Sequence, residues 1–163
     1  MIALDGGMQS HPNVLAVQDA LAAADAPGKI RLLPDAVHTA VAAAAALGVE
    51  VGQIANSLVF DADGDPLLVL TSGAHRVDTA RVAGVIGAGT VRRAAPDFVR
   101  EHTGQVIGGV APVGHPKPIR TLVDVALAGY GEVWAAGGVP QAVFPTTFDE
   151  LVRITEGTPA RVD

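Results

Sequence analysis

The segment that most constrains the fold of this chain is residues 108–116, Gly-Gly-Val-Ala-Pro-Val-Gly-His-Pro. Three glycines and two prolines in nine residues exclude a helix or a central strand, because glycine weakens both and proline fixes φ and lacks an N–H. The segment therefore has to form a stiff loop. Since glycine carries no side chain, the peptide groups of such a loop can come close to a ligand. We expect a ligand-contacting loop here.

Apolar spacing and end signals divide the rest of the chain into short helices and strands. Helices are predicted over 12–25, 39–48, 78–84, 96–103 and 147–157, and strands over 29–33, 54–60, 67–71, 90–93, 132–136 and 141–144, with one or two more in 119–127. Strands come in hairpins more often than in β-α-β order. The prediction is an α/β protein of the mixed α+β kind, with one domain over 1–163 and a mixed, largely antiparallel sheet flanked by helices.

The composition indicates which side chains can form the hydrophobic core and which cellular compartment suits the protein. Hydrophobic residues make up 49% of the 163 positions but aromatic residues only 4%, so a core of small aliphatic side chains is expected. The absence of cysteine excludes disulfides and thiolate metal sites and suits a reducing compartment. The first ten residues contain Asp5 and no basic residue, unlike a signal peptide, and no apolar run reaches the length of a membrane span. We expect a cytoplasmic protein that does not enter a membrane.

The charge distribution leaves two interpretations open. The net charge of −6 argues against a dedicated nucleic-acid-binding protein. Residues 71–120, which include the glycine loop, nevertheless carry seven basic and three acidic side chains. This local excess is either ordinary solvated surface or a positive entrance to a site for an anionic ligand.

Common catalytic motifs are missing from the sequence. It contains no phosphate-binding Walker loop, no Gly-x-Ser-x-Gly nucleophile motif and no histidine pair with metal-ligand spacing. Asn56 is unusual, because strand alternation places it in an apolar row with Ile54, Leu58 and Phe60. Its amide is either hydrogen-bonded within the protein or projects into a pocket, since a buried unpaired amide is costly.

Several short segments follow one another in a characteristic order. They are Thr39 with 47–49 (LGV), 53–60 (QIANSLVF), 71–73 (TSG), 76–78 (RVD), 103–104 (TG), 108–114 (GGVAPVG), 136–137 (AG) and 149–157 (DELVRITEG). In this order and spacing, from about residue 11 to 158, the chain resembles the YbaK/ProX family. That family comprises free-standing aminoacyl-tRNA editing domains related to the insertion domain of bacterial prolyl-tRNA synthetases.

The resemblance implies a pocket for the aminoacylated 3′ end of tRNA and hydrolysis of the ester that joins a wrong amino acid to the terminal ribose. The Gly-x-x-x-Pro loop of the family corresponds to 108–112. Residues expected in catalysis are Asn56, Gly108 and Gly109. Substrate contacts are expected from Val110, Ala111, Pro112, Gly114, His115, Ser72, Gly73 and His75, and phosphate contacts from Arg76, Lys117 and Arg120. No metal or cofactor is predicted.

Asn56 departs from the family pattern, because many members have a lysine at this position. Asparagine keeps a donor and an acceptor but loses the charge. The first hypothesis is therefore a trans-acting aminoacyl-tRNA deacylase with an altered preference or with charge supplied by another residue. The second is a catalytically weak or inactive module that binds tRNA or an aminoacyl-tRNA synthetase. A small-molecule binder or a hydrolase of free aminoacyl esters, independent of tRNA, is a third, and a homodimer is left open.

Overall fold

One mixed sheet of eight strands runs through the computed structural model, which describes residues 10–163. The strands are β1 (Arg31–Leu32), β2 (Ile54–Ala62), β3 (Asp65–Ser72), β4 (Val91–Arg93), β5 (Arg120–Asp124), β6 (Val133–Ala136), β7 (Ala142–Thr146) and β8 (Thr158–Ala160). The helices are α2 (Pro12–Ala23), α3 (Ala40–Leu47), α4 (Thr79–Ile86), α5 (Pro96–Thr103) and α6 (Phe148–Thr155), with 3-10 turns at Val51–Gln53 and Val125–Gly129. None of these helices is long and apolar enough to span a bilayer.

The strand order confirms the predicted mixed sheet. It runs β1-β7-β6-β2-β3-β5-β8, and β4 pairs with β2 outside this path. Among the described residues, four of the strand pairs are antiparallel and three are parallel. The β2–β3 hairpin closes in two residues, Asp63 and Gly64, which both have positive φ as such a tight turn requires. This hairpin loop is shorter than the predicted one.

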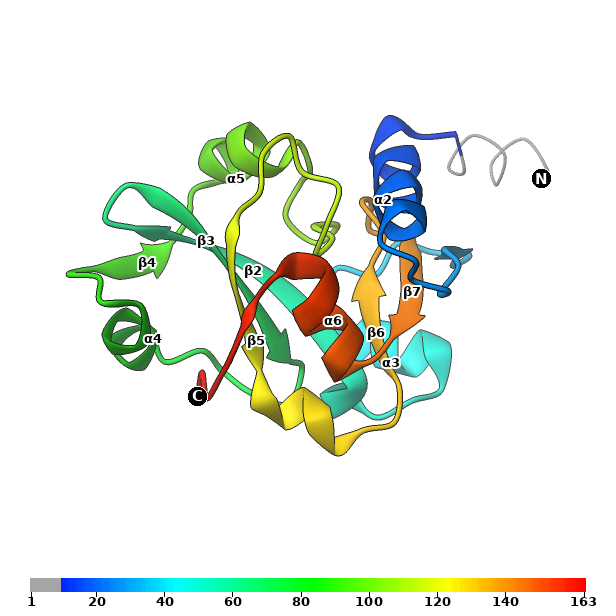
Figure 1. The fold of residues 1–163 in the computed structure, drawn as a ribbon. Helices are drawn as coiled ribbons and strands as arrows, with labels where there is room; N and C mark the ends of the chain where they lie inside the picture. The colour runs from blue at the N-terminus through cyan, green and yellow to red at the C-terminus, as the bar shows by residue number, and fades with distance from the viewer. Residues whose placement is uncertain (1–9) are drawn as a thin grey trace.

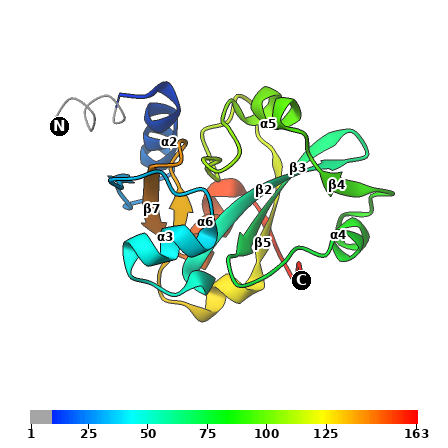
Figure 2. The ribbon, with the colours of Figure 1, turned by 180° about the vertical axis from the view of Figure 1, so that it is seen from behind.

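Helices cover both faces of the sheet. On one face, α2, α5 and α6 contribute Val17, Val99 and Leu151 to a core cluster that contains Leu68 and Leu70 of β3. Figure 1 shows α6 in front of the sheet, and Figure 2 shows α3 on the opposite side. There the alanines of α3 pack near Ile54, while Val82 of α4 joins a separate cluster around Phe60. The strand β3 is central in the sheet, between β2 and β5, and almost fully buried.

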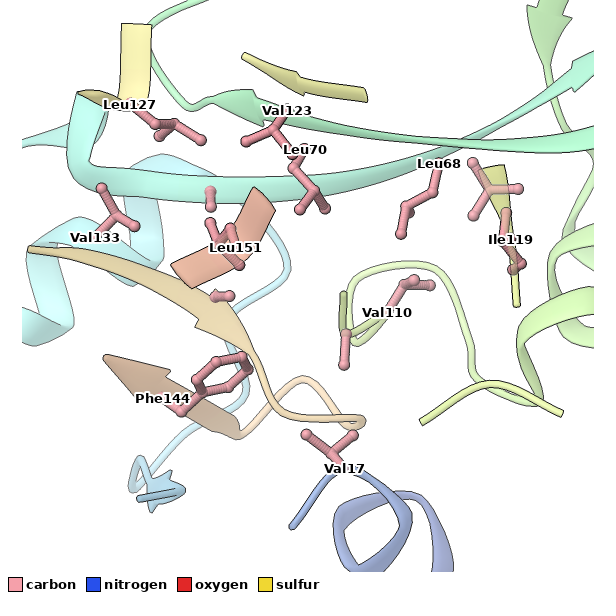
Figure 3. Packing of buried hydrophobic residues seen from close by; sticks show 14 of the residues in the cluster. Val17, Leu68, Leu70, Val110, Ile119, Val123, Leu127, Val133, Phe144 and Leu151 are labelled. Carbon is pink, nitrogen blue, oxygen red and sulfur yellow. The ribbon is translucent and has the colours of Figure 1, made fainter. Parts of the chain in front are cut away.

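The edge of β2 that faces away from β3 is open in its middle. Ile54 and Ala55 pair there with β6, whereas Phe60 to Ala62 pair with β4. Gly73 N donates to the carbonyl of Ile54, so the even-numbered residues of β2 form their hydrogen bonds with β3. Because the hydrogen-bonding direction alternates along a strand, the N–H and C=O of Ser57 point into the opening on the other side. The loop that contains Val110 covers this region, and Figure 3 shows the Val110 side chain pointing toward Leu68. The sheet is thus interrupted beside Asn56.

Candidate active site

A cleft in two parts lies at the open edge of β2. The inner pocket has a volume of about 490 Å³ including its open mouth, and small apolar side chains such as Ala40, Ala43 and Ala136 line much of it. The outer groove measures about 1270 Å³ on the same basis and contains His75, Arg76 and Arg93. Both parts share the same residues at their junction, namely His38, Thr39, Ala40, Asn56, Ser57 and Gly108. A ligand can therefore extend continuously from the groove into the pocket.

Asn56 occupies this junction with a free side-chain amide. It is half-buried, and it shares a face of β2 with Ile54 and Phe60, as strand alternation predicted. Its amide makes no hydrogen bond to any group of residues 10–163. This geometry favours the interpretation that the amide faces a pocket over that of a hydrogen-bonded structural amide.

The glycine loop directs alternate peptide groups into different environments. Gly109 N donates to the carbonyl of Val106 at 2.9 Å, and Ala111 N donates to Oε1 of Gln105 at 2.8 Å. The N–H groups of Gly108 and Val110 have no acceptor within residues 10–163, and both residues line the inner pocket. Two residues of the pocket wall thus carry main-chain N–H groups that are not bonded within the described part of the chain.

Two further polar atoms belong to residues that line the inner pocket. Oγ of Ser57 and Nε1 of Trp134 are buried and have no hydrogen-bond partner among the described residues. Each atom has almost no accessible surface, so a ligand in the pocket cannot contact either of them. The inner pocket is therefore mostly apolar, with a few polar groups at fixed positions.

The surroundings of Gly108 and Gly109 leave little space for a side chain at either position. Gly108 has a φ of +95°, and a Cβ at this position would lie 3.1 Å from Nδ1 of His38. A Cβ on Gly109 would lie 2.8 Å from the backbone of Val139. The loop is fixed by its packing against 139–140, in agreement with the prediction of a stiff loop.

Several residues predicted for the site lie apart from the cleft. Pro112, Gly114, His115 and Lys117 line a separate hollow beside the end of α6. The side chain of the exposed Arg120 donates to the carbonyl of Ile86 at 3.4 Å. Ala111 is fully buried. From Pro112 onward the loop lines this other hollow, so its second half does not face Asn56.

Ser72 and Gly73 have structural contacts. The hydroxyl of Ser72, which is 1% exposed, donates to the carbonyl of Gly52. A Cβ on Gly73 would lie 2.5 Å from the carbonyl oxygen of Val51, so the glycine permits close packing of the 3-10 turn. The structure brings together Asn56, Gly108, Val110, His75 and Arg76, while Ser72 and Gly73 support the end of β3 behind them.

The cleft also contains residues that sequence reasoning did not single out. Arg93 reaches the groove because β4 pairs with the far end of β2. His38 and Thr39 reach it from the start of α3, where Oγ1 of Thr39 accepts from Ala42 N. The helix cap was predictable from the sequence, but the contact with the cleft depends on tertiary structure. Within residues 10–163, no group of three His, Asp or Glu side chains is arranged to hold a metal ion.

The aminoacyl-tRNA editing domain model matches residues 34–154, a range that includes the whole cleft. The chain belongs to this family. The YbaK/ProX resemblance is thereby confirmed. A solved structure of a candidate trans-editing enzyme for prolyl tRNA synthetase is 43% identical, with a TM-score of 0.87, and the match covers 93% of this chain and 97% of that one.

Relatives of the editing domain occur both as short proteins and inside synthetases. The uncharacterized protein YwhH of Bacillus subtilis (strain 168) is 33% identical over 110 residues, which are 67% of this chain and 69% of YwhH. Proline–tRNA ligase of Nitratidesulfovibrio vulgaris (strain DP4) is 32% identical over 92 residues, or 56% of this chain. That match spans only 16% of the ligase, so the chain corresponds to a small part of it.

His75 forms a fixed wall of the groove in this editing domain. Its Nδ1 lies 3.0 Å from Oδ2 of Asp124, and its Nε2 lies 3.7 Å from Oδ2 of Asp163. Asp124 is 1% exposed and also accepts from the N–H groups of Ser72 and Ala126. Because each ring nitrogen faces a carboxylate, the ring is held in place at the edge of the groove.

His115 gives the editing domain a pH-dependent stability. Burial lowers its pKa below the ordinary value of 6.5, despite the hydrogen bond to the carbonyl of Ala111. The unfolded chain therefore binds more protons than the folded protein as the pH falls below 6.5. The free energy of unfolding that His115 contributes is fully present above that pH and decreases toward the lowered pKa.

Urea unfolding at several pH values tests this effect of His115. The free energy of unfolding is expected to fall less at acidic pH in His115→Gln than in the wild type, and equal decreases in both proteins would contradict this.

Proposed function

We propose that this editing domain is a trans-acting aminoacyl-tRNA deacylase, which hydrolyses the ester of a mischarged tRNA. One observation carries the proposal: Asn56, with its free amide, lines the same pocket as Gly108 and Val110, whose N–H groups are unbonded. Donors fixed in this way can stabilise an oxyanion as it forms. Membership of the editing-domain family supports the same function.

The reaction needs no protein nucleophile, because an aminoacyl ester is already activated. A water molecule adds to the ester carbonyl, the negative charge moves to the carbonyl oxygen, and the N–H groups of Gly108 and Val110 stabilise it. The bond to the ribose oxygen then breaks, and the proton lost by the water passes to that oxygen. The products are a free amino acid and uncharged tRNA. Asn56 donates to the carbonyl oxygen or orients the water.

The two parts of the cleft suit the two parts of the substrate. Small apolar walls in the inner pocket fit the side chain of a small amino acid, while the groove fits the terminal nucleotide. Arg76 and Arg93 lie on the groove and are suited to contact phosphate. Their charges compensate for the lysine that Asn56 replaces. Lys117 and Arg120 lie outside the cleft, so the charge comes from Arg76 and Arg93 in this proposal.

Replacing the groove arginines is expected to weaken tRNA binding, because each substitution removes an electrostatic contact with a phosphate. Arg76→Ala and Arg93→Ala should each raise KM for tRNA and reduce the slope of log affinity against log salt by about 0.7. Lys117→Ala and Arg120→Ala are matched controls that remove the same charge outside the cleft. Binding titrations between low and moderate salt measure the slopes. Equal losses in all four variants would contradict the assignment of phosphate contacts to the groove.

The direct test is deacylation of purified mischarged tRNAs. Since relatives occur within proline–tRNA ligases, the panel begins with tRNA(Pro) charged with alanine, cysteine or serine, and continues with other tRNAs wrongly charged with these amino acids. The proposal expects at least one of these esters to be hydrolysed faster than its spontaneous rate, and correctly charged prolyl-tRNA to be spared. Failure to hydrolyse any of them would refute the proposal.

The uncharged Asn56 favours a second function, that of a binding module without hydrolysis. In that case the wild type binds the aminoacylated end of tRNA but leaves the ester intact. Asn56→Lys would then gain hydrolysis, because a cation restores the missing charge near the carbonyl oxygen. Robust turnover by the wild type would exclude this second function.

A further inference from the structure

The backbone of Ala111 is held at both its N–H and its C=O, so the peptide units on both sides of its Cα are fixed. Its N–H donates to Oε1 of Gln105 at 2.8 Å, and its carbonyl oxygen accepts from Nε2 of His115 at 2.7 Å. Gln105 is 1% exposed and Ala111 is fully buried. The two side chains reach the peptide from different places, because Gln105 follows α5 and His115 belongs to the hollow beside α6.

Gln105 is itself fixed to the end of α5. Its N–H donates to Oγ1 of Thr103 at 2.9 Å, and that hydroxyl lies 2.7 Å from the carbonyl of Val99. Nε2 of Gln105 has no acceptor among residues 10–163, although it is buried. An unpaired buried donor destabilises a fold, and an apolar side chain would avoid this loss. The glutamine therefore supplies an acceptor for Ala111 N, which an apolar side chain of the same size could not provide.

This arrangement determines which peptide groups of the loop remain available. With Ala111 fixed by two hydrogen bonds and Gly109 N bonded to Val106, the N–H groups of 108–111 that remain without an acceptor in the described residues are those of Gly108 and Val110. We propose that Gln105 and His115 are positioning residues, which hold these two donors toward the ester carbonyl by clamping the backbone on both sides of Ala111. The inference rests on the proposed deacylase function.

Two substitutions at His115 distinguish the effect of losing its hydrogen bond from the effect of changing its packing. His115→Gln keeps an N–H donor at a similar reach, whereas His115→Phe keeps a ring and removes the donor. Thr155→Val is the control, because Thr155 lines the same hollow and its hydroxyl donates to the carbonyl of Leu151, away from the Ala111 backbone. We expect His115→Phe to lower kcat about tenfold with KM changed less than about twofold, since oxyanion donors act in the transition state. His115→Gln and Thr155→Val should stay within about threefold of the wild type in kcat.

Gln105→Met tests the other end of the clamp. It keeps the volume but removes the acceptor for Ala111 N, and we expect a loss of kcat similar to that of His115→Phe. Amide exchange of Ala111, followed by NMR, should become faster in this variant. Wild-type kcat in both variants, or an equal loss in His115→Gln and His115→Phe, would overturn the positioning role.

The positioning role of Gln105 and His115 can also be tested if the wild type hydrolyses no ester. That result refutes the deacylase function and leaves the clamp to be judged from the amide resonances of Gly108 and Val110. Displaced resonances in His115→Phe and Gln105→Met, with unchanged ones in Thr155→Val, support the clamp. Unchanged resonances in every variant overturn it.

Discussion

Gly109→Ala is expected to lower the rate of deacylation by about 100-fold, an effect comparable to the loss of an oxyanion-hole donor. The added Cβ would lie 2.8 Å from Cα of Val139 and 2.9 Å from Cδ of Pro140, so the loop has to move away from 139–140. Because the neighbouring N–H groups of Gly108 and Val110 are on the same loop, they move with it. Single-turnover deacylation measures the loss.

Gly129→Ala is the matched control for this variant. A Cβ at Gly129 meets nothing within 4 Å, and the residue lies at the end of a 3-10 turn outside the cleft. We expect wild-type activity in this control. Both proteins should show cooperative unfolding, so that a loss of fold can be distinguished from a displaced loop. If Gly109→Ala retained wild-type activity, the positions of the loop amides would not matter for the reaction.

Asn56→Asp is expected to reduce deacylation by about 100-fold as well. A carboxylate of similar size at the junction of pocket and groove repels both the developing oxyanion and the phosphate of the terminal nucleotide. Asn56→Ala removes the amide without adding charge, and we expect a smaller loss of about tenfold. Rates at saturating tRNA separate the effect on chemistry from the effect on binding.

The order of these two losses tests the role assigned to Asn56. The aspartate variant should be slower than the alanine variant, because repulsion adds to the lost donor. Equal wild-type rates in both would show that Asn56 takes no part in the reaction. Asn56→Lys offers a further comparison, since a gain of hydrolysis only in this variant would favour the binding-module function.

Most of the helices and strands were predictable because the chain marks their ends. Thr39 caps α3, and Gly48 ends it in a left-handed conformation, as the sequence indicated. Pro96 and Gly104 bracket α5 in the same way. The strand β8 was missed, because three residues that include Pro159 carry no periodic pattern and pair only through their contact with β5.

The candidate site was only partly predictable, because it depends on how distant segments meet. Asn56 was found as a polar residue in an apolar row, and Gly108 as part of a loop that excludes regular structure. Arg93 was missed because only the pairing of β4 with β2 brings it to the groove. Lys117 was grouped with the loop by its closeness in sequence, whereas the loop lines the other hollow from Pro112 onward and Lys117 lies there too.

The central claim is that the N–H groups of Gly108 and Val110 bind the acyl end of an aminoacylated adenosine. An amide-linked aminoacyl-adenosine, which cannot be hydrolysed, can be titrated into isotopically labelled protein while backbone N–H resonances are followed by NMR. We predict that the Gly108 and Val110 resonances shift in a saturable manner, together with the side-chain amide of Asn56. Saturable shifts confined to Lys117 and Thr155 in the other hollow, with Gly108 and Val110 unchanged, would contradict the claim.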